Sequence, residues 1–124
     1  MVTKFESINP MEMTAPRGGK GMAKSFPYEI LKGIDGKVKA FNHMRLEKDS
    51  AIGYHQHIDD LEIYIVTEGK GIYNDNGMEV EVGVNDVMLC NKGEHHGLAS
   101  KDGTLDFIAV IIGWLFRRKI NYLK

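Results

Sequence analysis

The sequence predicts an all-β fold of consecutive antiparallel strands, and three observations carry this prediction. Glycine is frequent, with 14 residues in a chain of 124, and it divides the sequence at short intervals. Short apolar or alternating runs lie between the glycines, with no helical period through the middle of the chain. Asn76-Gly77 separates two such runs and is the strongest short signal for a β-hairpin. Many short strands joined by tight turns are typical of a β-sandwich or a small barrel.

The predicted strands follow one another from residue 37 onward, after a turn at 34–36. They are expected at 37–48, 51–57, 61–69, 70–75, 78–82, 86–91 and 105–112. Segment 78–82 alternates strictly, so Val80 and Val82 should face the core while the two glutamates between and beside them face water.

The length permits one domain with its own core. We expect three parts in chain order: an extended N-terminal arm, a barrel domain and a C-terminal tail, at 1–25, 26–112 and 113–124. Apolar residues in the tail recur at helical spacing, which suits a short amphipathic helix, and a final strand fits equally well.

Composition and charge exclude several classes of protein. The net charge of −1 offers no electrostatic basis for binding nucleic acid. The longest apolar run, at 107–116, is too short to cross a membrane, and the N-terminal residues lack the apolar segment of a secretory signal. Cys90 has no second cysteine to pair with. We therefore expect a cytoplasmic protein.

Two histidines and a glutamate carry the predicted chemistry. His55 and His57 share one face of a strand with Cβ atoms about 6.5–7 Å apart, so both imidazoles can approach one ion. Glu62 has the opposite parity, and a continuous strand would point it away. Turn-forming residues at 58–60 allow the chain to reverse, so that Glu62 returns to the same interior. His96, which lies between glycine turns, is the better candidate than its neighbour for a fourth ligand.

Residues 53–69 resemble the first motif of the cupin family. The motif is a histidine, any residue, a histidine, four residues, a glutamate, six residues and a glycine, here His55, His57, Glu62 and Gly69.

The second cupin motif is also similar. Where the family has glycine, proline, glycine and histidine, this chain has Asn85, Asn91, Gly93 and His96. Asparagine tolerates the left-handed backbone that glycine adopts, so Asn85 is a mild departure. Replacing the proline with Asn91 removes rigidity from the turn and leaves the histidine in place.

The resemblance covers roughly residues 38–112 and extends to small single-domain bacterial cupins, some of which are oxalate-decarboxylase-like. It implies an antiparallel double-stranded β-helix, also called a jelly-roll or cupin barrel. It also implies a metal site of His55, His57, Glu62 and His96. Three nitrogens and one carboxylate suit a divalent transition metal, namely Mn, Fe, Ni, Co or Zn.

Four other residues are candidates for the lining of a ligand pocket. Tyr64 follows Glu62 inward and is expected to line the pocket or to fill the core; Phe107 is a further expected lining residue. His43 and Arg45 share a strand face. If that face points inward, they can orient a carboxylate, and an outer polar face explains them equally well.

Two functions stay open at the level of sequence. The metal can promote decarboxylation, oxygenation or isomerisation of a small oxygenated acid, although no residue stands out as general acid or base. Alternatively, the protein binds a sugar or organic acid without turnover, in a regulatory role. A carboxylate or histidine beside the bound ligand would favour the enzyme.

The run 61–66 has an apolar outer face, formed by Leu61, Ile63 and Ile65. A second sheet layer, the N-terminal arm or a partner subunit must cover it. We expect a partner subunit or an exchanged arm, and hence a homodimer.

Overall fold

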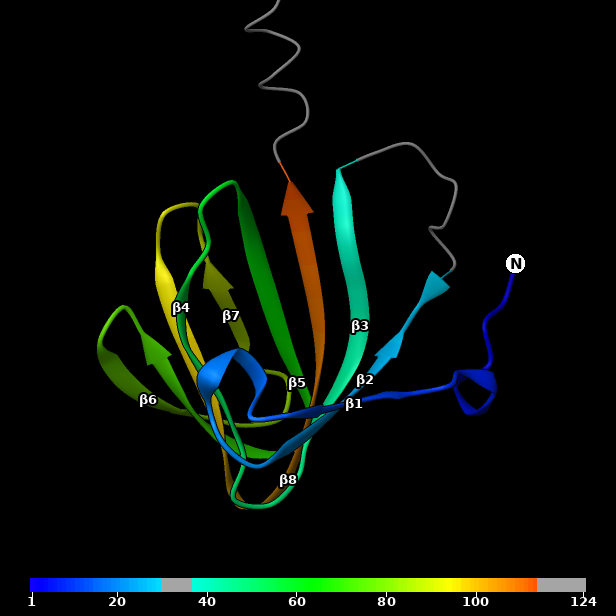
Figure 1. Cartoon of the computed structure of the whole chain (residues 1–124), viewed down its shortest axis with the longest axis horizontal. Coiled ribbons are helices and arrows are strands. Elements are labelled where there is room, and N and C mark those ends of the chain that lie inside the picture. The colour runs from blue at the N-terminus through cyan, green and yellow to red at the C-terminus, as the bar shows by residue number, and fades with distance from the viewer. Residues whose placement is uncertain (30–36, 114–124) are drawn as a thin grey trace, which may run out of the picture.

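The computed structural model describes residues 1–29 and 37–113. The chain forms an antiparallel β-barrel (Figure 1). Its strands are β1 Met11–Thr14, β2 Met22–Pro27, β3 Val38–Leu46, β4 Ala51–Gln56, β5 Asp60–Asp75, β6 Met78–Val82, β7 Val87–Cys90 and β8 His95–Gly113, with short 3₁₀ turns η1 at Phe5–Ser7 and η2 at Pro16–Gly18. The C-terminal helix considered above lies outside the described residues. None of the helices in the described ranges has the length and apolar character needed to cross a membrane.

Two long strands, β5 and β8, pair with each other and run through both walls of the barrel. The first half of β8 also pairs with β4, and its second half pairs with β3. Likewise, β5 pairs first with β7 and then with β6. The expected strands at 61–69 and 70–75 are therefore one strand, and the strand expected at 105–112 begins at His95. A bulge bends each long strand without ending it.

Gly69 lies at this bend, within the register shift between Glu68 and Lys70 of the β5–β8 pair. Its φ is +87°, and a Cβ atom there would lie 2.3 Å from the carbonyl oxygen of Thr104. Only glycine allows the two backbones to approach so closely.

The hairpin at Asn76-Gly77 is confirmed. Both residues have positive φ, +53° and +99°, as a type I′ turn requires, and they join β5 to β6. The expected alternation of β6 holds only in part, because Val82 is buried while Val80 is 43 % exposed. As an edge strand, β6 reaches the core only at its end.

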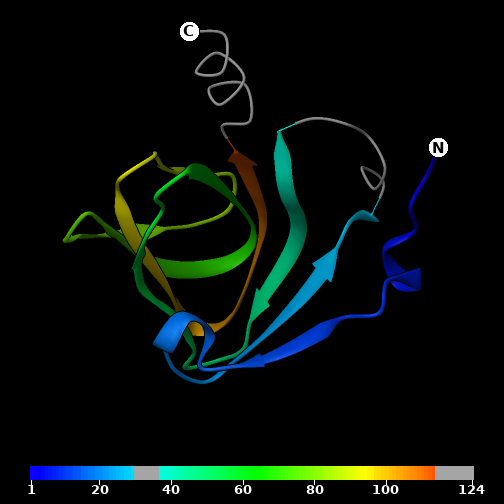
Figure 2. The same ribbon diagram turned by 45° about the horizontal axis from the view of Figure 1, so that its top comes forward.

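The residues expected to form an arm contribute β1 and β2 to the sheet. β2 pairs with β3, and β1 pairs with β2, so this part of the chain extends one wall beyond β3 (Figure 2). The boundaries between arm, barrel and tail stay a prediction. Between the walls lies a core whose most deeply buried residues include Leu46, Val66, Leu98, Leu105 and Phe107.

Candidate metal centre

The turn expected between His57 and Glu62 is present. β4 ends at Gln56 and β5 begins at Asp60, so the chain reverses between the histidines and the glutamate. Two backbone hydrogen bonds hold this turn against the loop that precedes β8. The amide of His57 donates to the carbonyl of Glu94 at 3.0 Å, and the amide of Gly93 donates to the carbonyl of His57 at 2.6 Å. The reversal resolves the parity conflict in the sequence.

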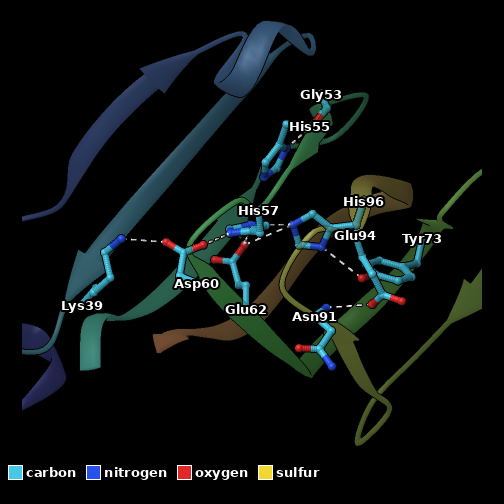
Figure 3. Close-up of polar contacts among 10 residues, drawn as sticks. All are labelled: Lys39, Gly53, His55, His57, Asp60, Glu62, Tyr73, Asn91, Glu94 and His96. Atoms are coloured by element: carbon cyan, nitrogen blue, oxygen red, sulfur yellow. Dashed lines mark hydrogen bonds and ion pairs between the residues drawn. The ribbon is translucent and has the colours of Figure 1, made fainter. Parts of the chain in front are cut away.

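Four side chains meet inside the barrel (Figure 3). One ligand atom from each of His55, His57, Glu62 and His96 lies within 4.8 Å of the other three. Glu62 Oε1 is 3.1 Å from His57 Nε2 and 3.2 Å from His96 Nε2, and the two nitrogens are 3.2 Å apart. Atoms bound at about 2.0–2.2 Å to one ion are themselves about 3–3.5 Å apart. The cluster therefore has dimensions that fit one metal ion.

Each of the three imidazoles uses its Nδ1 for a hydrogen bond away from the centre. The partners are the carbonyl oxygen of Gly53 for His55, at 2.7 Å, and the carboxylate of Asp60 for His57, at 2.6 Å. Both partners can only accept, so these histidines donate through Nδ1 and keep the lone pair of Nε2 for the centre.

The third imidazole, His96, has its Nδ1 3.0 Å from the hydroxyl oxygen of Tyr73. The same tautomer follows if Nδ1 donates to this oxygen, which again leaves Nε2 free. Tyr64 stacks on the His96 ring, with centroids 5.0 Å apart and planes 18° from parallel. Packing and hydrogen bonding thus orient the ring before any ligand binds.

The charges of the cluster agree with its geometry. Burial raises the pKa of Glu62, but the close imidazoles of His57 and His96 outweigh burial and lower this pKa to about 2. The pKa of His55 is lowered, first by burial and, among other causes, by the positive charge of Arg17. The contact with Glu62 also raises the pKa of His57, which shows that this position favours a positive charge. One carboxylate and three imidazoles are a donor set for a divalent transition metal.

A cavity of about 360 Å³ opens beside the cluster and is lined by three of its residues, His55, His57 and Glu62. Tyr64 and Phe107 line it, as the sequence indicated. Its other lining side chains are mainly apolar, with methionines from β1 and β3, and the polar ones outside the metal cluster are Arg17, Ser25 and Asn42.

His43 and Arg45 lie on the opposite side of β3 from the cavity. Asn42 and Met44 face the cavity, so the residues that alternate with them face outward. There His43 Nε2 and Arg45 Nη2 lie 2.7 Å and 2.9 Å from the buried carboxylate of Asp106. His43 and Arg45 therefore lie on an outer polar face, which is the second of the two alternatives, and they do not line the pocket.

Sequence reasoning did not single out Asp60, Tyr73, Arg17, Ser25 or Asn42. Asp60 had a local signal, because a carboxylate three residues after a ligand histidine can reach its ring. The others lie on distant segments, and only the strand pairing brings them to the site.

Comparisons with known proteins agree with this geometry. Residues 42–112, more than half of the chain, match the family model described as a cupin domain. An oxalate-binding protein of Thermotoga maritima is 34 % identical over 113 residues, which cover 90 % of this chain and 93 % of the relative.

Solved structures share the fold. A Thermotoga maritima crystal structure, described as a predicted oxalate decarboxylase, has a TM-score of 0.84 at 32 % identity and covers 91 % of this chain and 99 % of its own. A cupin from Silicibacter pomeroyi, described as a sugar phosphate isomerase, has a TM-score of 0.74 at 20 % identity, with coverages of 90 % and 75 %. The second likeness concerns the fold alone. The double-stranded β-helix, both motifs and these matches together establish that the chain belongs to the cupin family.

Proposed function

We propose that this protein binds a divalent transition metal through His55, His57, Glu62 and His96, and that it holds a small oxygenated organic acid such as oxalate at that ion. The observation that carries the proposal is the orientation of the imidazoles. Their Nδ1 atoms are used for hydrogen bonds away from the centre, and the Nε2 atoms of His57 and His96 lie 3.1 Å and 3.2 Å from Glu62 Oε1. A divalent ion beside one carboxylate keeps a net charge of about +1 and supplies Lewis-acid attraction for an anionic oxygen ligand. The name of the 34 % identical relative, an oxalate-binding protein, supports the choice of ligand.

The cavity favours reversible binding over turnover. Among the residues 1–29 and 37–113, its lining contains no carboxylate and no imidazole apart from the metal cluster itself. Tyr64 is held as a neutral phenol because burial raises its pKa well above the ordinary value. The lining therefore offers no free base beside the position of the ligand.

The metal assignment is tested by elemental analysis of the purified protein. We expect close to one transition-metal ion per chain, and its loss in the double variant His55→Ala/His57→Ala. His95→Ala is the matched control, because His95 stacks on Tyr54 outside the cluster and should leave the metal content unchanged. Full metal content in the double variant would refute the assignment.

The ligand is tested by calorimetry with oxalate on metal-loaded and chelator-treated protein. We expect binding only to the loaded form, with the oxalate recovered unchanged after prolonged incubation. Consumption of oxalate would replace the binding function with an enzymatic one. No binding to the loaded form would exclude oxalate as the ligand.

We also propose that the protein is a cytoplasmic homodimer. The apolar outer face comprises Leu61, Ile63 and Ile65 of β5, Val87 and Leu89 of β7, and Ile108, Val110 and Ile112 of β8, which stand opposite one another in register. Val87 is 64 % exposed and Leu89 is 48 % exposed. β1 and β2 extend the sheet beside β3 and leave this face uncovered within the described ranges, so a second copy is the partner we propose.

The proposed cytoplasmic location rests on Cys90, whose buried free thiol suits a reducing compartment.

A further inference from the structure

The cavity wall contains polar groups that the metal cluster does not use. Within residues 1–29 and 37–113, no hydrogen bond or ion pair joins the side chain of Arg17, Ser25 or Asn42 to another residue. All three nevertheless line the same cavity as the metal cluster. A set of unpaired polar groups in one cavity is typical of a surface that binds a ligand.

Ser25 is the most deeply buried of the three, with 7 % of its surface exposed. It stands in β2 opposite Met11 of β1 and Met44 of β3, and all three of these residues line the cavity. A buried hydroxyl without a partner is unfavourable. A polar ligand atom in the cavity would satisfy it.

Asn42 lies on β3, opposite Ala109 of β8, which in turn stands opposite Tyr64 of β5. Its amide therefore belongs to the same wall of the cavity as Ser25, since β2 and β3 are paired neighbours. An amide can donate two hydrogen bonds to a carboxylate.

Arg17 is positioned by a turn with an uncommon backbone. Ala15 and Arg17 both have left-handed φ values, +47° and +53°, which side chains other than glycine rarely adopt. The turn packs directly on β4, since a Cβ atom on Gly53 would lie 2.2 Å from the carbonyl oxygen of Arg17. Figure 3 shows this turn beside Gly53 and His55. The close packing fixes the backbone of this turn against β4, and the exposed residue Arg17 lines the cavity from this turn.

We propose that Arg17, Ser25 and Asn42 form a second subsite, which binds the far carboxylate of a small dicarboxylic acid whose other end is held at the metal centre. This inference rests on the proposed function. The guanidinium and the metal centre each supply positive charge, so a dianion neutralises both. Three methionines of the lining, Met11, Met13 and Met44, contact the carbon chain between the two ends.

The volume of the cavity limits the size of the acid. At about 360 Å³ it lies at the lower end of the range for small-molecule sites, roughly 300–1,000 Å³. The ligand class that fits is a 2-hydroxy or 2-oxo dicarboxylate of four or five carbons.

Calorimetry with L-lactate, L-malate and oxalate on the metal-loaded full chain tests the subsite. Malate is lactate with one further carboxylate, so the pair isolates the contribution of the far end. We expect malate to bind at least tenfold more tightly than lactate. Arg17→Gln should remove most of this preference, measured as the ratio of the malate and lactate affinities of the same metal-loaded variant, and Ser25→Ala should reduce it less.

Lys20→Gln is the matched control, because it removes a cation from the same turn at a residue that does not line the cavity. It should leave the malate preference intact. Two outcomes would overturn the subsite: equal affinity of the wild type for lactate and malate, or an unchanged malate affinity in Arg17→Gln. Either outcome would leave the metal-dependent binding of acids standing. Failure of all three acids to bind the loaded protein would overturn both proposals.

Discussion

At the scale of single residues, Asp60 decides how well the metal centre is arranged. Its carboxylate accepts a hydrogen bond from Nδ1 of His57 at 2.6 Å and another from Nζ of Lys39 at 2.8 Å. Figure 3 shows this chain of contacts from Lys39 to the centre. The arrangement fixes the tautomer of His57 and raises the basicity of its Nε2.

Asp60→Ala is therefore expected to lower metal affinity by about 10–100-fold, without removing any ligand. Competition with a chelator of known affinity measures this change. Glu12→Ala, which removes an exposed carboxylate from β1, should have no effect. An Asp60→Ala protein that binds metal as tightly as the wild type would show that the hydrogen bond does not support the ligand.

At the scale of elements, the ion cluster around Asp106 ties β3 to β8 on the outer side of the barrel. Burial raises the pKa of Asp106, but the hydrogen bonds from Arg45 and then His43 outweigh it, so the pKa is lowered overall. Arg45 also lies over the ring of Phe26, 5.3 Å from its centroid, which extends the cluster to β2. His43 and Arg45, for which the sequence left the pocket and the outer face equally open, thus have a structural role.

The lowered pKa of Asp106 makes the stability of the fold depend on pH. In the unfolded chain the Asp106 carboxylate takes up a proton near pH 3.9, which is above its pKa in the folded protein. The contribution of Asp106 to the free energy of unfolding is therefore complete above about pH 5, and it decreases as the pH falls through the folded pKa. Asp106→Asn should lower the free energy of unfolding by about 2 kcal/mol at pH 7. Denaturant titration at pH 7 and pH 3 should show a smaller gap between variant and wild type at pH 3. A gap of the same size at both values would contradict this role.

At the scale of the whole molecule, the outer face of β5, β7 and β8 is the interface that we propose for a homodimer. Ile63 stands opposite both Leu89 and Val110, and Ile65 stands opposite both Val87 and Ile108. The apolar side chains thus form one continuous surface over three strands. A surface of this kind in water is unfavourable and is typical of an interface.

Wild-type protein is accordingly expected to be a dimer by light scattering at micromolar concentration. Leu89→Glu places a charge in the middle of the outer face and should give a monomer. Met78→Glu is the control, because Met78 is also an exposed apolar residue but lies on β6, away from this face. This variant should stay dimeric. A monomeric wild type would exclude the interface.

Local patterns accounted for the elements and for the metal cluster. Residue parity placed His55 and His57 together and required a turn before Glu62, and the turn is there. Asn85 has φ +74°, the left-handed backbone expected at its position in the second motif. The hairpin at Asn76-Gly77 was equally clear, because the φ values that a type I′ turn needs depend on the residues themselves.

By itself, the sequence determined the all-β class, the hairpin and the grouping of His55, His57 and Glu62, since each depends on neighbours within a few residues. The resemblance to the second motif added His96 to this group. Only the tertiary structure decided which side of β3 faces the cavity, and so separated His43 and Arg45 from the site. It also joined Arg17, Ser25 and Asn42 to the metal cluster. The physical reason is that alternation tells which residues share a face, whereas the register with distant strands selects the face that is inside.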